Sequence, residues 1–252
     1  MADSKQGCYV YGVVPSDVET EPDARGVGDP PSEVTTIKHG DVAALVSTVS
    51  LDNSLGTPED LAAHAALLDG AAAAAPVLPM KFGAVLTSED DVAEELLAAH
   101  HDEFAAALRE LEGKAEYIVR ARYRHEAILK EILGENPELD ELREEIRDKP
   151  EDATRNERIS LGEAITNAIA AKRDADTETV RRALDDLGFM TVVREPTHDE
   201  DAAHVACLAE TEKESELEDA VERLAAEWQD RVEIRLLGPL AAYDFVVSKA
   251  AE

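Results

Sequence analysis

The hydrophobic positions of the chain recur with the two periods that distinguish strands from helices. Residues 7–14, Gly-Cys-Tyr-Val-Tyr-Gly-Val-Val, predict a first strand that ends at Pro15. Residues 16–32 are rich in Pro, Gly and Asp, which is typical of a loop. Residues 34–38 and 42–49 then predict a hairpin that turns at His39-Gly40-Asp41.

Two helices with recognisable ends follow. The first has Thr57 as its N-cap and Pro58 at the first helical position, and it ends at Pro76, which lacks a backbone donor. The second begins after Ser88, with three acidic residues in its first turn, and ends at Gly113. Together with the three strands, these helices predict one α+β domain over residues 1–112.

An apolar run, residues 76–86, lies between these helices and holds a single cation, Lys81. The run is too short for a buried helix, so it predicts a strand that begins irregularly at its two prolines and enters the core near Met80. A lone buried lysine needs a strongly lowered pKa. Lys81 is therefore expected to pair with a carboxylate or a helix C-terminus.

The second half of the chain has the order strand, helix, strand, strand, helix, strand, which is the ferredoxin-like order. Its strands are expected at residues 114–123, 189–194, 204–210 and 232–236, and its last helix at about 217–228. The first crossover is inflated by a helical insertion at about 134–175, interrupted at Gly134, Asn136-Pro137 and Pro150. This second domain, residues 113–252, ends in a tail whose residues 241–247 predict an extra edge strand.

The most informative feature of the composition is the formal net charge of −31. Such a charge repels phosphate backbones and anionic lipid, so nucleic acid and membrane are not expected partners. The acidic residues are spread along the whole chain, which is typical of a halophilic, cytoplasmic protein adapted to molar salt. Cys8 and Cys207 lie in apolar runs and predict buried thiols, with a disulfide only if the two strands meet. No stretch has a membrane-spanning length or the pattern of a signal peptide.

The candidate reactive groups form no recognisable catalytic, metal or cofactor site. His198-Asp199-Glu200-Asp201-Ala202-Ala203-His204 has ligand-type residues, but it falls on a hairpin turn without a fixed-geometry metal spacing, so a solvated turn is expected. The other histidines considered are expected to be ordinary surface or boundary residues: His64, His100, His101 and His125.

Arg120, Arg122 and Arg124 alternate on one face of a strand and form a cationic stripe in a strongly anionic chain. The stripe fits a dock for an acidic partner surface. The favoured alternative is internal pairing on the open face of the sheet, where Glu233 and Arg235 would lie in the neighbouring strand. The residues assigned to partner binding are Pro79, Met80, Lys81, Phe82, Arg120, Arg122 and Arg124.

Several runs together resemble the gas vesicle protein GvpF/GvpL family. They are Tyr9-Val10-Tyr11, residues 77–83 (Val-Leu-Pro-Met-Lys-Phe-Gly), residues 113–117 (Gly-Lys-Ala-Glu-Tyr), Asn136-Pro137-Glu138, and Leu237-Gly238-Pro239 through Tyr243-Asp244-Phe245. The chain departs from the family pattern twice. It has Lys81 where arginine is common, and residues 240–242, Leu-Ala-Ala, where Trp-Pro-Pro is common.

The resemblance implies a non-enzymatic accessory protein of gas vesicle assembly, without a cofactor, built from two α+β domains of which the second is a modified ferredoxin-like fold. It implies binding to the hydrophobic shell subunit and other accessory gas vesicle proteins, in the cytoplasm and at the gas vesicle. Two alternatives stay open. One is a ferredoxin-like module that binds a small regulatory ligand or acts as an enzyme domain, and the other is a minor structural component of the shell.

Overall fold

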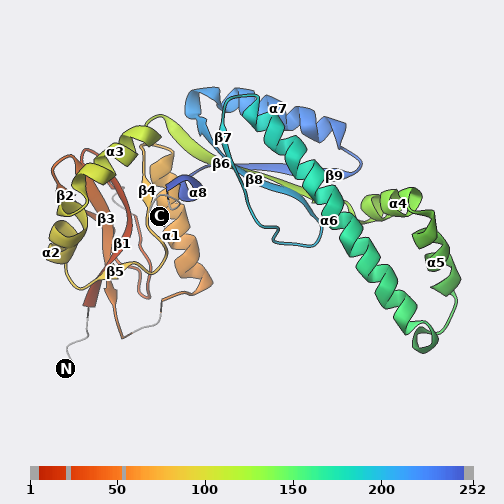
Figure 1. Cartoon of the computed structure of the whole chain (residues 1–252). Coiled ribbons are helices and arrows are strands. Elements are labelled where there is room, and N and C mark those ends of the chain that lie inside the picture. The colour runs from red at the N-terminus through yellow and green to blue at the C-terminus, as the bar shows by residue number, and fades with distance from the viewer. Residues whose placement is uncertain (1–5, 21–23, 53–54, 247–252) are drawn as a thin grey trace. The chain divides into compact units, whose positions relative to one another are not determined.

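The computed structural model describes residues 6–20, 24–52 and 55–246 (Figure 1). It is a mixed α+β structure, as predicted, and it divides into two compact units. Unit 1 contains the chain up to Tyr117, together with Leu208–Glu212 and the chain from Gly238 onward. Unit 2 contains Ile118–Cys207 and Lys213–Leu237.

Unit 1 is built on a sheet with the strand order β2-β3-β1-β4, in which β5 also pairs with β1. The predicted hairpin is confirmed, because β2 and β3 pair antiparallel with Thr35 opposite Val46 and His39 opposite Val42. The strands are β1 (Gln6–Pro15), β2 (Thr35–His39), β3 (Val42–Ser50), β4 (Leu78–Pro79) and β5 (Val85–Leu86).

Both faces of this sheet are covered. Alternate residues of β1 point to opposite sides. Tyr9 and Tyr11 pack with Leu68 of helix α1 (Pro58–Ala72), whereas Val10 and Val13 pack with Leu108 of helix α3 (His101–Leu111). A bulge between Val10 and Gly12 shifts the register of β1 against β3. The predicted start of α1 is confirmed by a capping box in which the Thr57 side chain accepts from the Asp60 N–H, but the helix ends at Ala72, before Pro76.

The central run is not the single strand that its composition predicts. It pairs with β1 as two short strands, β4 and β5, and a turn separates them. Gly83 sits at this turn with φ of +88°, a conformation that glycine adopts without strain, and its N–H donates to the Tyr9 hydroxyl (3.0 Å). The Tyr9 hydroxyl therefore accepts a backbone N–H that would donate to a strand carbonyl if the run were one continuous strand.

The predicted helix after Ser88 is also divided. It starts as α2 (Glu89–Asp91), continues as a π-helical segment (Val92–Ala98) and restarts as α3 after His100, which has non-helical dihedrals. His101 Nε2 lies 2.7 Å from Asp41 Oδ1 in the β2–β3 turn. This contact fixes the start of α3 against the hairpin.

Unit 2 has the predicted element order, and its sheet has the strand order β7-β8-β6-β9. Helices α6 and α7 lie along this sheet (Figure 1), and Val180, Leu184, Leu217 and Leu224 are buried. The strands are β6 (Lys114–Tyr123), β7 (Met190–Val193), β8 (Asp201–Glu210) and β9 (Val232–Leu240), and the helices are α4 (His125–Glu135), α5 (Pro137–Arg147), α6 (Arg155–Asp185) and α7 (Glu214–Glu227).

The breaks in the helical region fall where proline predicts them. Asn136-Pro137 separates α4 from α5, and a short 3₁₀ turn (Glu151–Ala153) follows Pro150. The predicted interruption at Gly134 is absent, because helix α4 continues through Gly134 to Glu135. A single glycine costs a helix only about 1 kcal/mol, which packing readily offsets.

The tail prediction is wrong in the described residues. Strand β9 continues through Gly238 and Pro239 to Leu240, because glycine lets the backbone pass close to Tyr117, where a Cβ would lie 2.5 Å from the ring. The chain then forms helix α8 (Tyr243–Val246) instead of a strand. The carboxylates of Asp69 and Glu116 accept the N–H groups of Ala241 (3.1 Å) and Asp244 (2.9 Å). Val247 lies outside the described residues.

Candidate functional site

The central run is built around an aromatic cluster inside unit 1. The Tyr9 hydroxyl lies 2.9 Å from His64 Nδ1, and the rings of Tyr9, Tyr11, His64 and Phe82 pack with centroids 4.8–5.9 Å apart. Burial lowers the pKa of His64 and raises the pKa of Tyr9 to about 12. Both groups therefore stay neutral near pH 7, so the prediction that His64 is a surface or boundary residue is wrong.

The four predicted binding residues of the central run have different environments. Pro79 is buried and Phe82 is half-buried in the aromatic cluster. Met80 is half-buried, and its N–H donates to the Tyr11 carbonyl (2.8 Å). Lys81 is exposed, and it makes no ion pair within the described part of the chain, so the predicted pairing of Lys81 is wrong. Exposure to water leaves its charge solvated without a partner.

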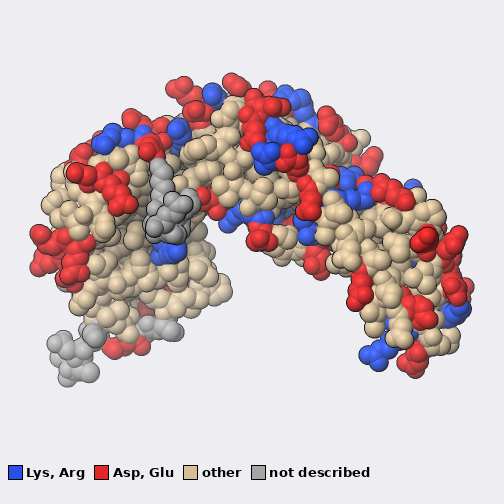
Figure 2. All heavy atoms as spheres, viewed as in Figure 1, with Lys and Arg blue, Asp and Glu red and all other residues tan. Residues whose placement is uncertain are grey.

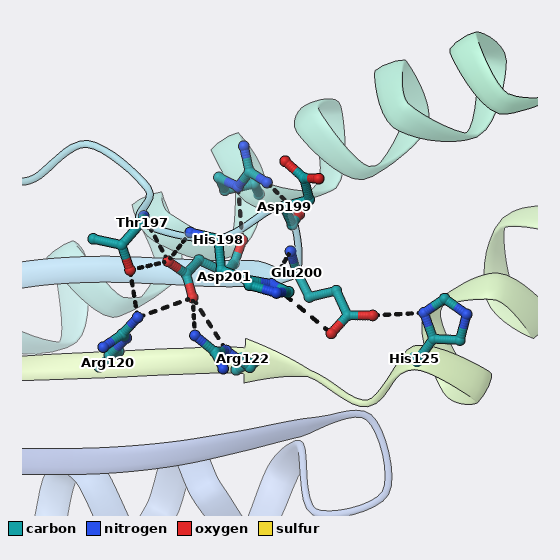
Figure 3. Close-up of polar contacts among 9 residues, drawn as sticks. Arg120, Arg122, His125, Thr197, His198, Asp199, Glu200 and Asp201 are labelled. Carbon is teal, nitrogen blue, oxygen red and sulfur yellow. Dashed lines mark hydrogen bonds and ion pairs between the residues drawn. The ribbon is translucent and has the colours of Figure 1, made fainter.

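Acidic residues are scattered over the visible surface of both units, with the cations interspersed among them (Figure 2). The predicted arginine stripe is one place where cations gather. Arg120 and Arg122 extend from β6 toward one carboxylate, that of Asp201 at the start of β8 (Figure 3). Asp201 Oδ1 lies 3.7 Å from Arg120 Nη2 and 3.3 Å from Arg122 Nη2.

Asp201 is the centre of this cluster. Its side chain is only 1% exposed, and its Oδ2 accepts the Thr197 N–H (2.8 Å), the Thr197 hydroxyl (3.0 Å) and the His198 N–H (2.9 Å). Burial alone would raise the pKa of Asp201, but the hydrogen bonds from Thr197 and His198 and the charge of Arg120 outweigh it and lower the pKa. The carboxylate is charged at neutral pH and holds both guanidinium groups in place.

The favoured interpretation of the stripe, internal pairing, is confirmed for two arginines but with a different partner. Glu233 pairs with Arg235 of its own strand (2.6 Å) instead of with Arg120 or Arg122. Arg124 is exposed and forms no ion pair among the described residues, although its charge, with that of Arg122, helps to lower the pKa of Glu233 after the larger effect of Arg235.

A second charged cluster in unit 2 has no counterpart in the predictions. Arg231 bridges Glu131 (2.6 Å) and Asp176 (2.7 Å) and lies over the ring of Tyr123, whose hydroxyl donates to Asp176 (2.5 Å). Lys172 adds a second cation 2.6 Å from Glu131. The signal available in the sequence is a tyrosine that ends a predicted strand, Tyr123, and an aspartate within a predicted helix, Asp176, both of which are buried, but their partners are distant in the chain.

The histidines and cysteines serve local contacts. His125 pairs with Glu200 (2.5 Å), and His204 Nδ1 lies 3.2 Å from the Glu195 carbonyl oxygen. No group of three His, Cys, Asp or Glu side chains with metal-binding geometry occurs in the part of the chain that the structure describes. Cys8 and Cys207 are both buried and free, and burial raises the pKa of Cys8 to about 11.

The fold and these contacts define a two-sheet α+β protein whose charged clusters fix strands and loops. Among residues 6–20, 24–52 and 55–246, none of the helices has the length and apolar character needed to cross a membrane. The model of the family described as gas vesicle synthesis protein GvpL/GvpF matches residues 7–247, so the chain belongs to this family.

Relatives and solved structures agree with this assignment. Gas vesicle protein F of Streptomyces sp. (strain CB03234) is 32% identical over 94% of this chain and 98% of its own length, and that of Dolichospermum flosaquae is 24% identical over 94% and 96%. The crystal structure of gas vesicle protein GvpF from Anabaena sp. PCC7120 has a TM-score of 0.74 at 22% identity, covering 96% of this chain and 98% of that one. GvpF from Microcystis aeruginosa has a TM-score of 0.71 at 23% identity, over 95% and 98%. The chain is thus a gas vesicle-related protein.

Proposed function

We propose that this chain is a non-enzymatic accessory protein of gas vesicle assembly that binds the hydrophobic shell subunit, other accessory gas vesicle proteins, or both. Its place of action in this proposal is the cytoplasm and the growing gas vesicle. The shell subunit must be strongly apolar on its gas side and is an aggregation hazard before assembly. A highly charged binder would keep such a subunit in solution until it adds to the shell.

The observation that carries the proposal is the arginine stripe. Arg120 and Arg122 are fixed by one buried carboxylate, and their side chains remain 35% and 44% exposed. Arg124 extends the stripe without an ion pair of its own in the described chain. Guanidinium groups held in place lose little side-chain entropy on binding, so they suit recognition of acidic groups on another polypeptide.

The central run provides the second proposed contact. Lys81 is its exposed residue, and its neighbours in the chain are the buried Pro79 and the half-buried Met80 and Phe82. A cation beside half-buried apolar side chains suits the edge of a protein interface, where charge sets orientation and on-rate more than affinity. In this proposal Lys81 contacts the partner, and the other three residues hold its backbone in position.

The test is retention of purified shell subunit and of each accessory protein on the immobilised full chain, in molar KCl. Arg124→Glu and Lys81→Glu should each reduce retention at least about tenfold. Arg223→Glu on α7 makes the same change of charge at an exposed helical position and should have no effect. If the unmodified chain retains none of these polypeptides, the proposed function is wrong.

A further inference from the structure

Strand β9 forms one edge of the second sheet. The strand order β7-β8-β6-β9 gives β9 a single neighbour, β6, so within the described part of the chain only one side of its backbone is paired. The strand at the opposite edge, β7, has 4 residues, whereas β9 has 9. Short length is one of the features that keep an edge strand from pairing with another chain. Strand β9 lacks this protection.

The other protective features are also missing from residues 232–237 of β9. Their sequence, Val-Glu-Ile-Arg-Leu-Leu, contains no proline, glycine or lysine, and Pro239 comes only near the end of the strand. The two charged residues, Glu233 and Arg235, are exposed and do not point into the core. The free backbone donors and acceptors of this segment can therefore continue the sheet.

The inward-facing residues of β9 are incompletely covered. Ile234 and Leu236 are half-buried, whereas Val119 in the central strand β6 is 0% exposed. A residue on an edge strand has a neighbouring strand on one side only, so part of its side chain stays in contact with water. A further strand beside β9 would cover both side chains and extend the apolar layer under the helices.

The charges of β9 make the strand complementary to itself. In an antiparallel pair of β9 strands centred on Ile234, Glu233 of one copy lies opposite Arg235 of the other, and the reverse holds at the symmetric position. Val232 then lies opposite Leu236, so apolar residues also meet apolar residues. Opposite charges directly across an antiparallel pair stabilise it, and like charges destabilise it. One two-fold arrangement therefore satisfies both charges and both apolar positions.

The local ion pair of β9 does not prevent this exchange of partners. Glu233 pairs with Arg235 of its own strand (2.6 Å), but their side chains are 51% and 71% exposed. Exposed ion pairs contribute little to stability, so rearranging this pair costs little. In the two-fold arrangement each carboxylate has a guanidinium of its own strand and one of the second copy within reach.

We propose that β9 binds a second copy of this chain by antiparallel pairing about a two-fold axis at Ile234. The axis is perpendicular to the sheet, so the two sheets become one continuous sheet with both open faces on the same side. Pairing of a single short edge corresponds to the lower end of interface sizes, so the dimer dissociates in the micromolar range. This inference goes beyond the proposed function, because dimerisation requires no gas vesicle polypeptide.

The net charge opposes dimerisation everywhere except at the contact itself. Two chains with a charge of −31 repel each other, but residues 232–237 contain one glutamate and one arginine and have no net charge. At 1 M salt the screening length is about 3 Å, so repulsion between distant surfaces is largely screened, whereas directly opposed side chains still interact. The dimer is therefore expected in molar KCl.

Sedimentation equilibrium of the full chain in molar KCl tests the proposal. Glu233→Arg places arginine opposite arginine at both symmetric positions, and Arg235→Glu places glutamate opposite glutamate. Each variant alone should raise the Kd of the dimer at least about tenfold. An equimolar mixture of the two variants should form a heterodimer, because the opposed residues again have opposite charges. Both replacements in one chain should restore the homodimer.

The controls make the same changes of charge away from β9. Glu218→Arg and Arg223→Glu lie at exposed positions of α7, and each should leave the Kd of the dimer unchanged. Circular dichroism checks that every variant folds. A homodimer that forms equally well in Glu233→Arg, or a mixture of the two β9 variants without a heterodimer, would overturn the inference.

Two further results separate this inference from the proposed function. If the unmodified chain stays monomeric up to high micromolar concentration while Glu233→Arg reduces its retention of a gas vesicle polypeptide, β9 binds a strand of that polypeptide and the inference is wrong. If the chain dimerises through β9 but retains no gas vesicle polypeptide, the inference is supported and the proposed function is wrong.

Discussion

At the scale of single residues, two buried aspartates fix the loops of the two units by the same chemistry. In unit 1, Asp60 accepts the N–H groups of Gly28 (2.8 Å), Gly56 (3.0 Å) and Thr57 (3.1 Å), and the Gly28 hydrogen bond is the main cause of its lowered pKa. Asp201 collects the Thr197 and His198 N–H groups in unit 2. Each carboxylate accepts hydrogen bonds from loop N–H groups that have no backbone carbonyl partner within the loop.

Asp201→Asn should lower the free energy of unfolding by about 2–3 kcal/mol, because it removes the charge facing two arginines and an acceptor for buried donors. The folded pKa of Asp201 is lowered, so its contribution is present above the unfolded value of about 3.9 and is lost as the pH falls through the folded pKa. Urea unfolding at pH 7 and pH 3 measures both effects. Glu233→Gln, at an exposed carboxylate, is the control and should leave the pH 7 midpoint unchanged. Identical midpoints for Asp201→Asn and the unmodified chain at pH 7 would contradict this.

His101 should stabilise unit 1 only in its protonated form. The hydrogen bond with Asp102 is the main cause that raises the pKa of His101 above its ordinary value. The hydrogen bond with Asp41 and the negative charges of both aspartates raise it further. The contribution is therefore fully present below about pH 6.5 and disappears as the pH rises through the folded pKa. His101→Gln should lower the thermal midpoint at pH 5.5 and leave it unchanged at pH 9. His100→Gln, at the neighbouring exposed histidine, serves as the control, and equal effects of the two variants at both pH values would count against this role.

Alternation along one strand was enough to find the arginine stripe, but not its partner. Arg122 and Asp201 are 79 residues apart in the chain, and a loop folds back to bring them together. The sequence favours Glu233 as the partner of the stripe, because Glu233 lies in the neighbouring strand β9. In the structure Glu233 instead pairs with Arg235 of its own strand (2.6 Å). The alternation along a strand predicts which face of the sheet a residue occupies. It does not predict which carboxylate an arginine on that face will contact, because loop N–H groups position the carboxylate, as those of Thr197 and His198 do for Asp201.

At the scale of elements, prediction succeeded where one residue determines the outcome and failed where several weak preferences compete. Thr57, Pro137 and Pro150 fix helix boundaries through a cap or a missing donor, and the structure has those boundaries. The central run has strand-like composition, but the Tyr9 hydroxyl and Gly83 divide it. In the tail, two carboxylates from distant elements bind the N–H groups of Ala241 and Asp244 and favour a helical turn.

Helices α4 and α6 are held to the end of β6 by Arg231, which predicts a large effect of its removal. Arg231→Met leaves Glu131 and Asp176 close together with only Lys172 to compensate them, so the free energy of unfolding should fall by about 3 kcal/mol. Arg235→Met is a matched control at a 71% exposed arginine a few residues further along the chain. It should change the urea midpoint little, since exposed pairs contribute little. Comparable losses in both variants would mean that the Arg231 cluster is not a stabilising clamp.

At the scale of the whole molecule, the charge of −31 should dominate the response to salt. Local pairs such as those of Asp201 and Arg231 neutralise only part of it, and acidic side chains without an ion pair in the described chain remain on the helices, including Glu157, Glu163, Glu218 and Glu222. Their mutual repulsion acts over a screening length of about 10 Å at 0.1 M salt and about 3 Å at 1 M. The compact state is therefore expected to need molar salt, as the composition predicts.

Circular dichroism between 0.05 and 3 M KCl should show loss of helical signal at the low end and recovery at the high end. Replacing Glu157, Glu163, Glu218 and Glu222 by Gln removes four negative charges from exposed helical positions without touching a described ion pair, so recovery should occur at lower KCl. The same four replacements leave the apolar core unchanged, so a shift in the salt requirement reports electrostatic repulsion alone. A signal that stays constant from low to molar KCl in the unmodified chain would mean that the paired clusters already hold both units against that repulsion.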